Sequence, residues 1–117
     1  MAKVARTGAE KRRTKPNLFF YVDSPEQAVP VLMLCAVTPR AVRCFYVPSE
    51  SRLGAADDVQ RTAEIAQAWL FQNGVERLTF KTIHMGPDQR LEGIVSKLAA
   101  DAERAGLVFR GPADGEA

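Results

Sequence analysis

The chain has 117 residues, of which 46% are hydrophobic and 26% are charged, and its formal net charge is +2. This length suits one globular domain with a single core. No apolar run is long enough for a membrane-spanning helix, so the composition predicts no membrane partner.

The charge is unevenly distributed along the chain. Before Pro16, six basic residues face only Glu10, so this N-terminal arm carries +5, and the remainder, with 10 basic and 13 acidic residues, carries −3. A single-sign run of this density does not fold alone and is typical of an arm that binds nucleic acid. A solubilising tail or a processing remnant is the alternative. The basic residues of the arm are Lys3, Arg6, Lys11, Arg12, Arg13 and Lys15.

The first part of the chain predicts three strands in an antiparallel meander. Asn17–Asp23 is rich in aromatic residues, Val29–Val37 is a continuous apolar run that suits a central strand, and Ala41–Val47 alternates. Thr38–Arg40 is a tight connection between the last two. The third strand is expected to present Val42, Cys44 and Tyr46 on one face and Arg43, Phe45 and Val47 on the other.

The second part predicts a helix, a strand, a helix and a short strand. These elements are expected at Ala55–Asn73, Val75–Met85, Gln89–Ala105 and Leu107–Phe109, because apolar residues recur at helical spacing in the first and third segments. Two apolar stripes should face the core: Val59, Thr62, Ala63, Ala66, Trp69 and Leu70 on the first helix, and Leu91, Ile94, Val95, Leu98 and Ala102 on the second.

Local signals define the ends of these helices. Gly74 and Gly106 are suited to left-handed caps, and Asp88 is positioned to cap the second helix at its N-terminus. Trp69 and Leu98 are expected to lie in the core.

The element order β-β-β-α-β-α-β predicts an α/β fold with a mixed sheet (α+β in the broader sense), because right-handed crossovers give such a sheet a parallel portion. This is the order of ribonuclease-H-like folds and of certain components of the translational machinery. The expected organisation is a basic arm at residues 1–16 that RNA would order, a single α/β domain at 17–110 and a flexible tail at 111–117.

Catalytic signals are sparse. Cys35 and Cys44 lie in apolar strand-like runs without a second Cys or His pair at ligand spacing, so we expect buried core thiols rather than a disulfide or a metal site. His84 has no nucleophile beside it and is expected to be a surface or RNA-contacting residue at the end of a strand. No metal, cofactor or small-molecule substrate is predicted.

A ribonuclease-H-like nuclease is one alternative, because such enzymes hold two metal ions with clustered carboxylates. The aspartates among the candidate residues each have a plainer role: a turn, a helix cap or a carboxylate in the first turn of a helix. They are Asp23, Asp57, Asp58, Glu64 and Asp88. A small protein-interaction or inhibitor module, acting through the acidic helix faces, is a second alternative.

Two segments carry a family resemblance. These are DDVQRTAEIAQAWLFQNGVERLTF and LAADAERAGLVF (Leu98–Phe109). Both resemble the 5S ribosomal RNA carriers, the eighteenth family of large-subunit ribosomal proteins. The loop HMGPDQRLEG departs from that family, with only Gly93 placed comparably. Met85-Gly86-Pro87 followed by Arg90 is instead similar to the eleventh small-subunit family, a platform protein that shares the fold.

Both resemblances imply a non-catalytic structural protein of the ribosome, in the cytoplasm or an organelle such as the mitochondrion. The implied partners are ribosomal RNA, with 5S ribosomal RNA as first choice and small-subunit platform RNA as second, and neighbouring ribosomal proteins. At least one of Phe19, Phe20 and Tyr21 would face outward to stack on a base; the alternative is that these residues cover the second layer of the sheet. The expected RNA-binding residues are Lys3, Arg6, Lys11, Arg12, Arg13, Lys15, Arg40, Arg43 and Arg52.

Overall fold

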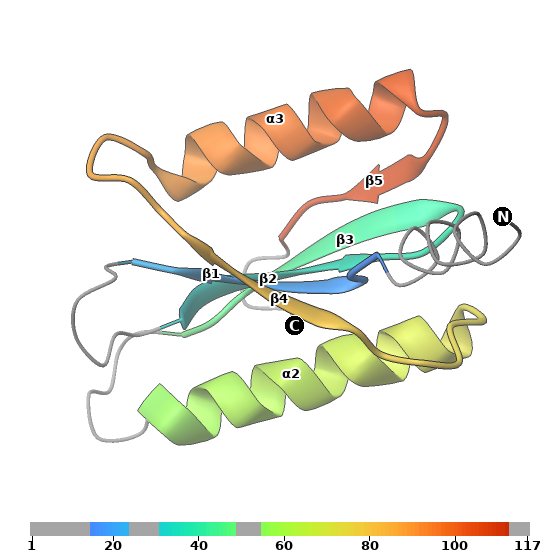
Figure 1. The fold of residues 1–117 in the computed structure, drawn as a ribbon, viewed down its shortest axis with the longest axis horizontal. Helices are drawn as coiled ribbons and strands as arrows, with labels where there is room; N and C mark the ends of the chain where they lie inside the picture. Colours follow the sequence, from blue (N-terminus) through green and yellow to red (C-terminus); the bar gives the residue numbers. More distant parts are fainter. Residues whose placement is uncertain (1–14, 24–30, 49–54, 113–117) are drawn as a thin grey trace, which may run out of the picture.

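The chain folds as a helix, a sheet and a second helix in three layers (Figure 1). The computed structural model describes residues 15–23, 31–48 and 55–112. Within these residues, five strands form one mixed sheet in the order β4-β1-β2-β3-β5. The elements are β1 (Leu18–Val22), β2 (Val31–Val37), β3 (Ala41–Tyr46), α2 (Ala55–Gln72), β4 (Phe80–His84), α3 (Leu91–Arg104) and β5 (Val108–Arg110). The predicted fold class and element order are confirmed.

The connections explain why the helices lie on opposite faces. β1, β2 and β3 form the predicted antiparallel meander, while β4 runs parallel to β1 and β5 parallel to β3. The chain therefore crosses the sheet from β3 to one edge through α2, and returns to the other edge through α3. Two right-handed crossovers that run in opposite directions place their helices on opposite faces, as Figure 1 shows for α2 and α3.

The face beneath α2 is tightly packed. Leu18, Leu34 and Ala36 of the sheet and Ala66 and Leu70 of the helix are all 0% exposed. Trp69 lies on the predicted face of α2 but is only half-buried, with its ring edge-on to Phe45 at a centroid distance of 6.5 Å. The predicted stripe of α2 is confirmed, and Leu70 rather than Trp69 is its most deeply buried large residue.

The face beneath α3 is covered less completely. Its sheet residues are buried, but α3 contributes only Ala102 as a buried residue. Leu98 packs against this buried cluster but is itself only half-buried, as Trp69 is on the other face. The reason is the position of α3, which packs on β3 and β5 at one edge of the sheet. The stripe faces the sheet as predicted, and its half-buried members are Leu91, Ile94, Val95 and Leu98.

Both helices end in a Schellman motif. Gly74 has φ +91°, and the bonds Gly74 N–H to Phe71 O (3.2 Å) and Val75 N–H to Leu70 O (3.0 Å) close the last turn of α2. Gly106, with φ +77°, ends α3 in the same way. The two glycine stops are thus confirmed. The strand predicted from Val75 begins only at Phe80, because the Val75 amide is used in the cap.

The start of α3 differs from the prediction. Arg90 is its N-cap residue and makes no side-chain capping bond, so Asp88 is not the cap. Instead, residues 86–89 form a turn in which Gln89 N–H donates to Gly86 O (3.1 Å) and the Gln89 Oε1 accepts from Gly86 N–H (2.7 Å). This turn delays the helix to Leu91, two residues after the predicted start.

Candidate nucleic-acid interface

Three arginines lie on or beside the β3–β5 pair at one edge of the sheet. Arg43 and Arg110 are direct register partners in this parallel pair. Arg40 lies in the turn just before β3, and its carbonyl accepts a hydrogen bond from Val108 N–H at 2.9 Å. We call Arg40, Arg43 and Arg110 the arginine group. Arg40 and Arg110 are exposed, and Arg43 is half-buried.

The turn between β2 and β3 holds Arg40 by local hydrogen bonds. Thr38 is buried, and its Oγ1 accepts from Arg40 N–H (3.1 Å) and Ala41 N–H (2.9 Å). Thr38 N–H in turn donates to Ala41 O (2.8 Å). Such a side-chain turn, with Pro39 presetting one φ angle, fixes the backbone from which Arg40 projects.

The ring of Phe45 orients the Arg43 side chain. Its guanidinium carbon lies 4.9 Å from the centroid of the Phe45 ring, on the α2 side of β3. A guanidinium over an aromatic face is held by cation–π attraction and keeps its N–H donors free for other acceptors.

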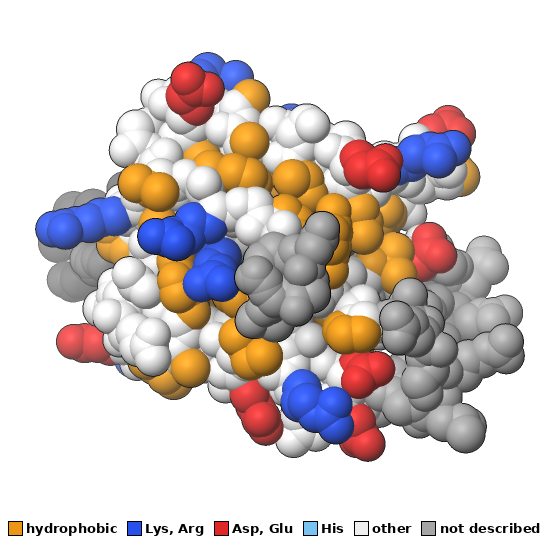
Figure 2. Space-filling model, turned by 180° about the vertical axis from the view of Figure 1, so that it is seen from behind, with side chains coloured by type: hydrophobic (Ala, Val, Ile, Leu, Met, Phe, Trp, Pro, Cys, Tyr) orange, Lys and Arg blue, Asp and Glu red, His pale blue; other side chains and the backbone are white. Residues whose placement is uncertain are grey.

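The arginine group has no acidic partner among the described residues. The ion pairs among the described residues join Arg61 to Asp58 (3.5 Å) and Arg104 to Asp101, and each of them lies within one helix. Like charges directly opposite one another on neighbouring strands are unfavourable. Figure 2 shows Lys and Arg side chains lying side by side on one face without Asp or Glu between them. An anion bound there would relieve this repulsion.

Lys15, the last basic residue of the arm, lies at the end of the sheet that carries Arg40. Lys15 is exposed, and its carbonyl accepts from Thr79 Oγ1 at 2.9 Å. β1 and β3 are both antiparallel to β2, so they start at the same end of the sheet. With neighbouring strands about 4.8 Å apart, Lys15 and Arg40 are offset across the sheet by roughly 10 Å. Lys15 and the arginine group are therefore positioned to contact one extended polyanion.

The predicted binding residues have different outcomes. Lys15, Arg40 and Arg43 lie where a common ligand can reach them. Arg110 was missed, because its proximity to Arg43 depends on the β3–β5 pairing, which has no local sequence signal. The other predicted residues lie outside the described residues: Lys3, Arg6, Lys11, Arg12, Arg13 and Arg52.

The expected outward aromatic residue is on another strand. Tyr21 is buried and Phe19 and Phe20 are half-buried, so the first strand presents no fully exposed ring. Phe80 on the edge strand β4 is 54% exposed, with its ring centroid 6.0 Å from that of Phe20. Phe71 on α2 is exposed to a similar extent, 52%, so Phe80 and Phe71 are the described phenylalanine rings most accessible to a base.

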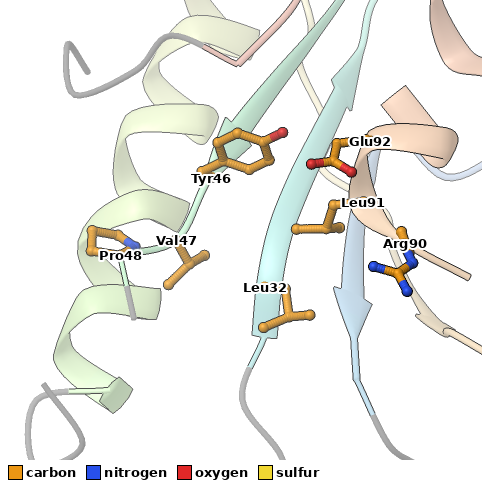
Figure 3. A pocket seen from close by; sticks show the side chains of 7 residues that line it. All are labelled: Leu32, Tyr46, Val47, Pro48, Arg90, Leu91 and Glu92. Atoms are coloured by element: carbon orange, nitrogen blue, oxygen red, sulfur yellow. The ribbon is translucent and has the colours of Figure 1, made fainter. Parts of the chain in front are cut away.

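A hollow of about 580 Å³ lies between the ends of β2 and β3 and the start of α3. Figure 3 shows Tyr46, Leu91 and Glu92 directed toward this space, with Leu32 at its base. Its two charged residues, Arg90 and Glu92, have opposite signs. The hollow therefore lacks the single-sign charge that would attract a polyanion.

The candidate carboxylates do not form a metal site among the described residues, where no group of three or more His, Cys, Asp or Glu side chains is close enough to hold an ion. Asp23 and Asp88 follow the adjacent parallel strands β1 and β4 at the same sheet end, and both are exposed. His84 is exposed at the end of β4, as predicted. No helix in the described part of the chain is both long and apolar enough to cross a membrane.

Comparison with known proteins gives one informative similarity. No family model matches the chain, and no solved structure matches it. Over 106 residues, or 90% of its length, the chain is 34% identical to an aspartate–tRNA(Asp/Asn) ligase from Saccharopolyspora erythraea. These residues are only 16% of that ligase, so the chain spans a small part of this relative.

Proposed function

We propose that this chain is a non-catalytic RNA-binding protein that contacts the phosphate backbone. The observation that carries the proposal is the arginine group, three neighbouring cations without an acidic partner among the described residues. Arginine forms paired hydrogen bonds with phosphate oxygens, and each neutralised phosphate releases counterions. The arm, with its +5 charge, would extend the contact along the same RNA backbone.

The RNA that we favour is ribosomal RNA, with 5S ribosomal RNA first and small-subunit platform RNA second. This choice rests on the resemblance of the Asp57–Phe80 and Leu98–Phe109 segments to 5S carriers. In that setting, neighbouring ribosomal proteins would contact the more acidic remainder of the chain.

Transfer RNA is the candidate ligand outside the ribosome. The 34% identity to part of an aspartate–tRNA(Asp/Asn) ligase favours it over other RNAs outside the ribosome. Because the matched segment is 16% of that ligase, the proposal concerns binding to tRNA and not aminoacylation.

Crosslinking in cells, followed by sequencing of the attached RNA, tests the proposal and separates these ligands. Full-length chain should enrich one RNA class: 5S ribosomal RNA, platform RNA or tRNA. A chain lacking residues 2–13 should lose most of the crosslinked RNA, since it lacks five of the arm's six basic residues.

Background-level RNA on the full-length chain would overturn the proposal and favour the protein-interaction module. The arm deletion also discriminates by function, because an inhibitor that acts through its helix faces should keep its activity without the arm. The nuclease alternative requires magnesium-dependent RNA cleavage that is lost in Asp23→Asn or Asp88→Asn.

A further inference from the structure

Two thiols face each other between β2 and β3. Cys35 and Cys44 are Cα partners in the register of these strands, and both are free. Each is 1% exposed, packed with Tyr21 and Met33 on the α3 side of the sheet. Arg43 precedes Cys44 on β3 but packs with Phe45 on the opposite, α2 side of the sheet, so the proposed RNA site does not use these thiols.

The strand register places the thiols at disulfide distance. The bond from Thr38 N–H to Ala41 O (2.8 Å) makes those two residues a hydrogen-bonded pair at the turn. Hydrogen-bonded and non-hydrogen-bonded pairs alternate along an antiparallel ladder, and Cys35–Cys44 lies three steps further, at a non-hydrogen-bonded position. The Cα atoms of such pairs are about 4.5 Å apart, within the roughly 4.4–6.8 Å range of disulfides.

The two thiols are also chemically unequal. A hydrogen bond from Cys35 lowers the pKa of the Cys44 thiol. The same bond, together with burial, raises the pKa of Cys35. Cys44 therefore loses its proton first, and the thiolate is the form that attacks an oxidant. Cys35 keeps its proton within reach of the attacking sulfur.

We propose that Cys35 and Cys44 form an oxidisable dithiol, a modification site that hydrogen peroxide converts to an intramolecular disulfide. The Cys44 thiolate attacks one peroxide oxygen, the O–O bond breaks, and the sulfur becomes a sulfenic acid while the released hydroxide takes up a proton as water. The Cys35 sulfur then attacks the sulfenic sulfur, and a second water leaves. Two thiols and one peroxide thus give one disulfide and two waters.

Access to the thiols is through α3. This helix contributes a single buried residue, Ala102, and its Leu91, Ile94, Val95 and Leu98 are only half-buried. Elements with few deeply buried contacts open locally at lower free energy than the whole domain. Such an opening admits a small oxidant more readily than a bulky one. Hydrogen peroxide therefore reaches the thiols more readily than a peptide disulfide does.

The test is intact mass spectrometry of the full chain after treatment with hydrogen peroxide under native conditions. The chain should lose the mass of two hydrogen atoms, and two thiols should become resistant to alkylation until a reductant is added. Cys35→Ala should instead accumulate a sulfenic acid on Cys44 that a dimedone probe captures. Leu98→Ala, which thins the cover of α3, should accelerate disulfide formation.

Two results would overturn the proposal. The first is a native chain that keeps two alkylatable thiols and forms the disulfide only in denaturant. The second is overoxidation of one cysteine to the sulfinic acid, with the other left free, since this shows that Cys35 does not resolve the sulfenic acid. The wild-type measurement decides the question even if a variant fails to fold, and it does not depend on whether the chain binds RNA.

Discussion

The two faces of the sheet differ in how their helices cover them. Under α2, the cluster of Leu18, Leu34, Ala36, Ala66 and Leu70 excludes solvent completely. Under α3, the sheet residues are buried while most of the helix stripe stays half-exposed. The difference indicates that α2 supplies most of the packing free energy, and that α3 is the element most free to open.

The largest expected effect is on the α2 side. Leu70→Ala removes a fully buried side chain and leaves a cavity between α2 and the sheet, so it should lower the free energy of unfolding by about 2–5 kcal/mol. Urea denaturation followed by circular dichroism measures this. A loss below about 1 kcal/mol would contradict the assignment of the stable core to this face.

The second prediction concerns Tyr21 beneath α3. Burial, with a smaller contribution from the neighbouring thiols, raises the pKa of Tyr21 to about 12 from the ordinary 10.0. Between these pH values the unfolded chain releases the tyrosine proton and the folded chain keeps it. Stability is therefore unaffected by this group below pH 10 and falls as the pH rises toward 12, by at most about 1.4 kcal/mol per unit.

Comparison with Tyr21→Phe isolates this contribution from that of the two neighbouring thiols. Wild type should lose more stability than Tyr21→Phe between pH 10 and 12 in parallel urea titrations. Coinciding pH profiles would mean that α3 leaves Tyr21 in contact with water. The face beneath α3 would then be covered even less completely than its half-buried helix residues indicate.

The smallest effect is expected from Leu98→Ala on α3. Because Leu98 is half-buried, the substitution should cost about 1 kcal/mol, well below Leu70→Ala. Hydrogen exchange sharpens the comparison, since amides of α3 should exchange faster in this variant while those of α2 do not change. A cost equal to that of Leu70→Ala would remove the distinction between the faces.

Local patterns predicted the elements well. The 3.6-residue periodicity indicated both helix faces, the alternation along Ala41–Tyr46 indicated its two sides, and Gly74 and Gly106 indicated both helix ends. The start of α3 was missed because the Gly86–Gln89 turn competes with an Asp88 cap. The half-burial of Leu98 was missed because periodicity gives a face and not its depth of cover.

The candidate sites depended on strand pairing. The arrangement of Cys35 opposite Cys44 follows from the short Thr38–Ala41 turn, so it was within reach of sequence reasoning, although only two separate core thiols were predicted. The pairing of β5 with β3 could not be predicted from the sequence. Two long crossover connections precede β5, and nothing local in the sequence indicates which strand it joins. Arg110 therefore joined the arginine group only in three dimensions.

If the arginine group binds RNA phosphates, removing its charges should weaken the salt dependence of RNA affinity. The probe is the RNA recovered by crosslinking, titrated over a range of salt concentrations. The double variant Arg43→Gln, Arg110→Gln should flatten the slope of log K against log salt by about two phosphate contacts, and Arg12→Ala, Arg13→Ala by a similar amount.

The matched control is Arg61→Gln, Arg104→Gln, which changes the net charge equally at two arginines already paired with acids. This control is expected to keep a slope close to that of wild type. Equal slopes for the arginine-group variant, the control and wild type would contradict the account, because binding would then not involve the β3–β5 edge.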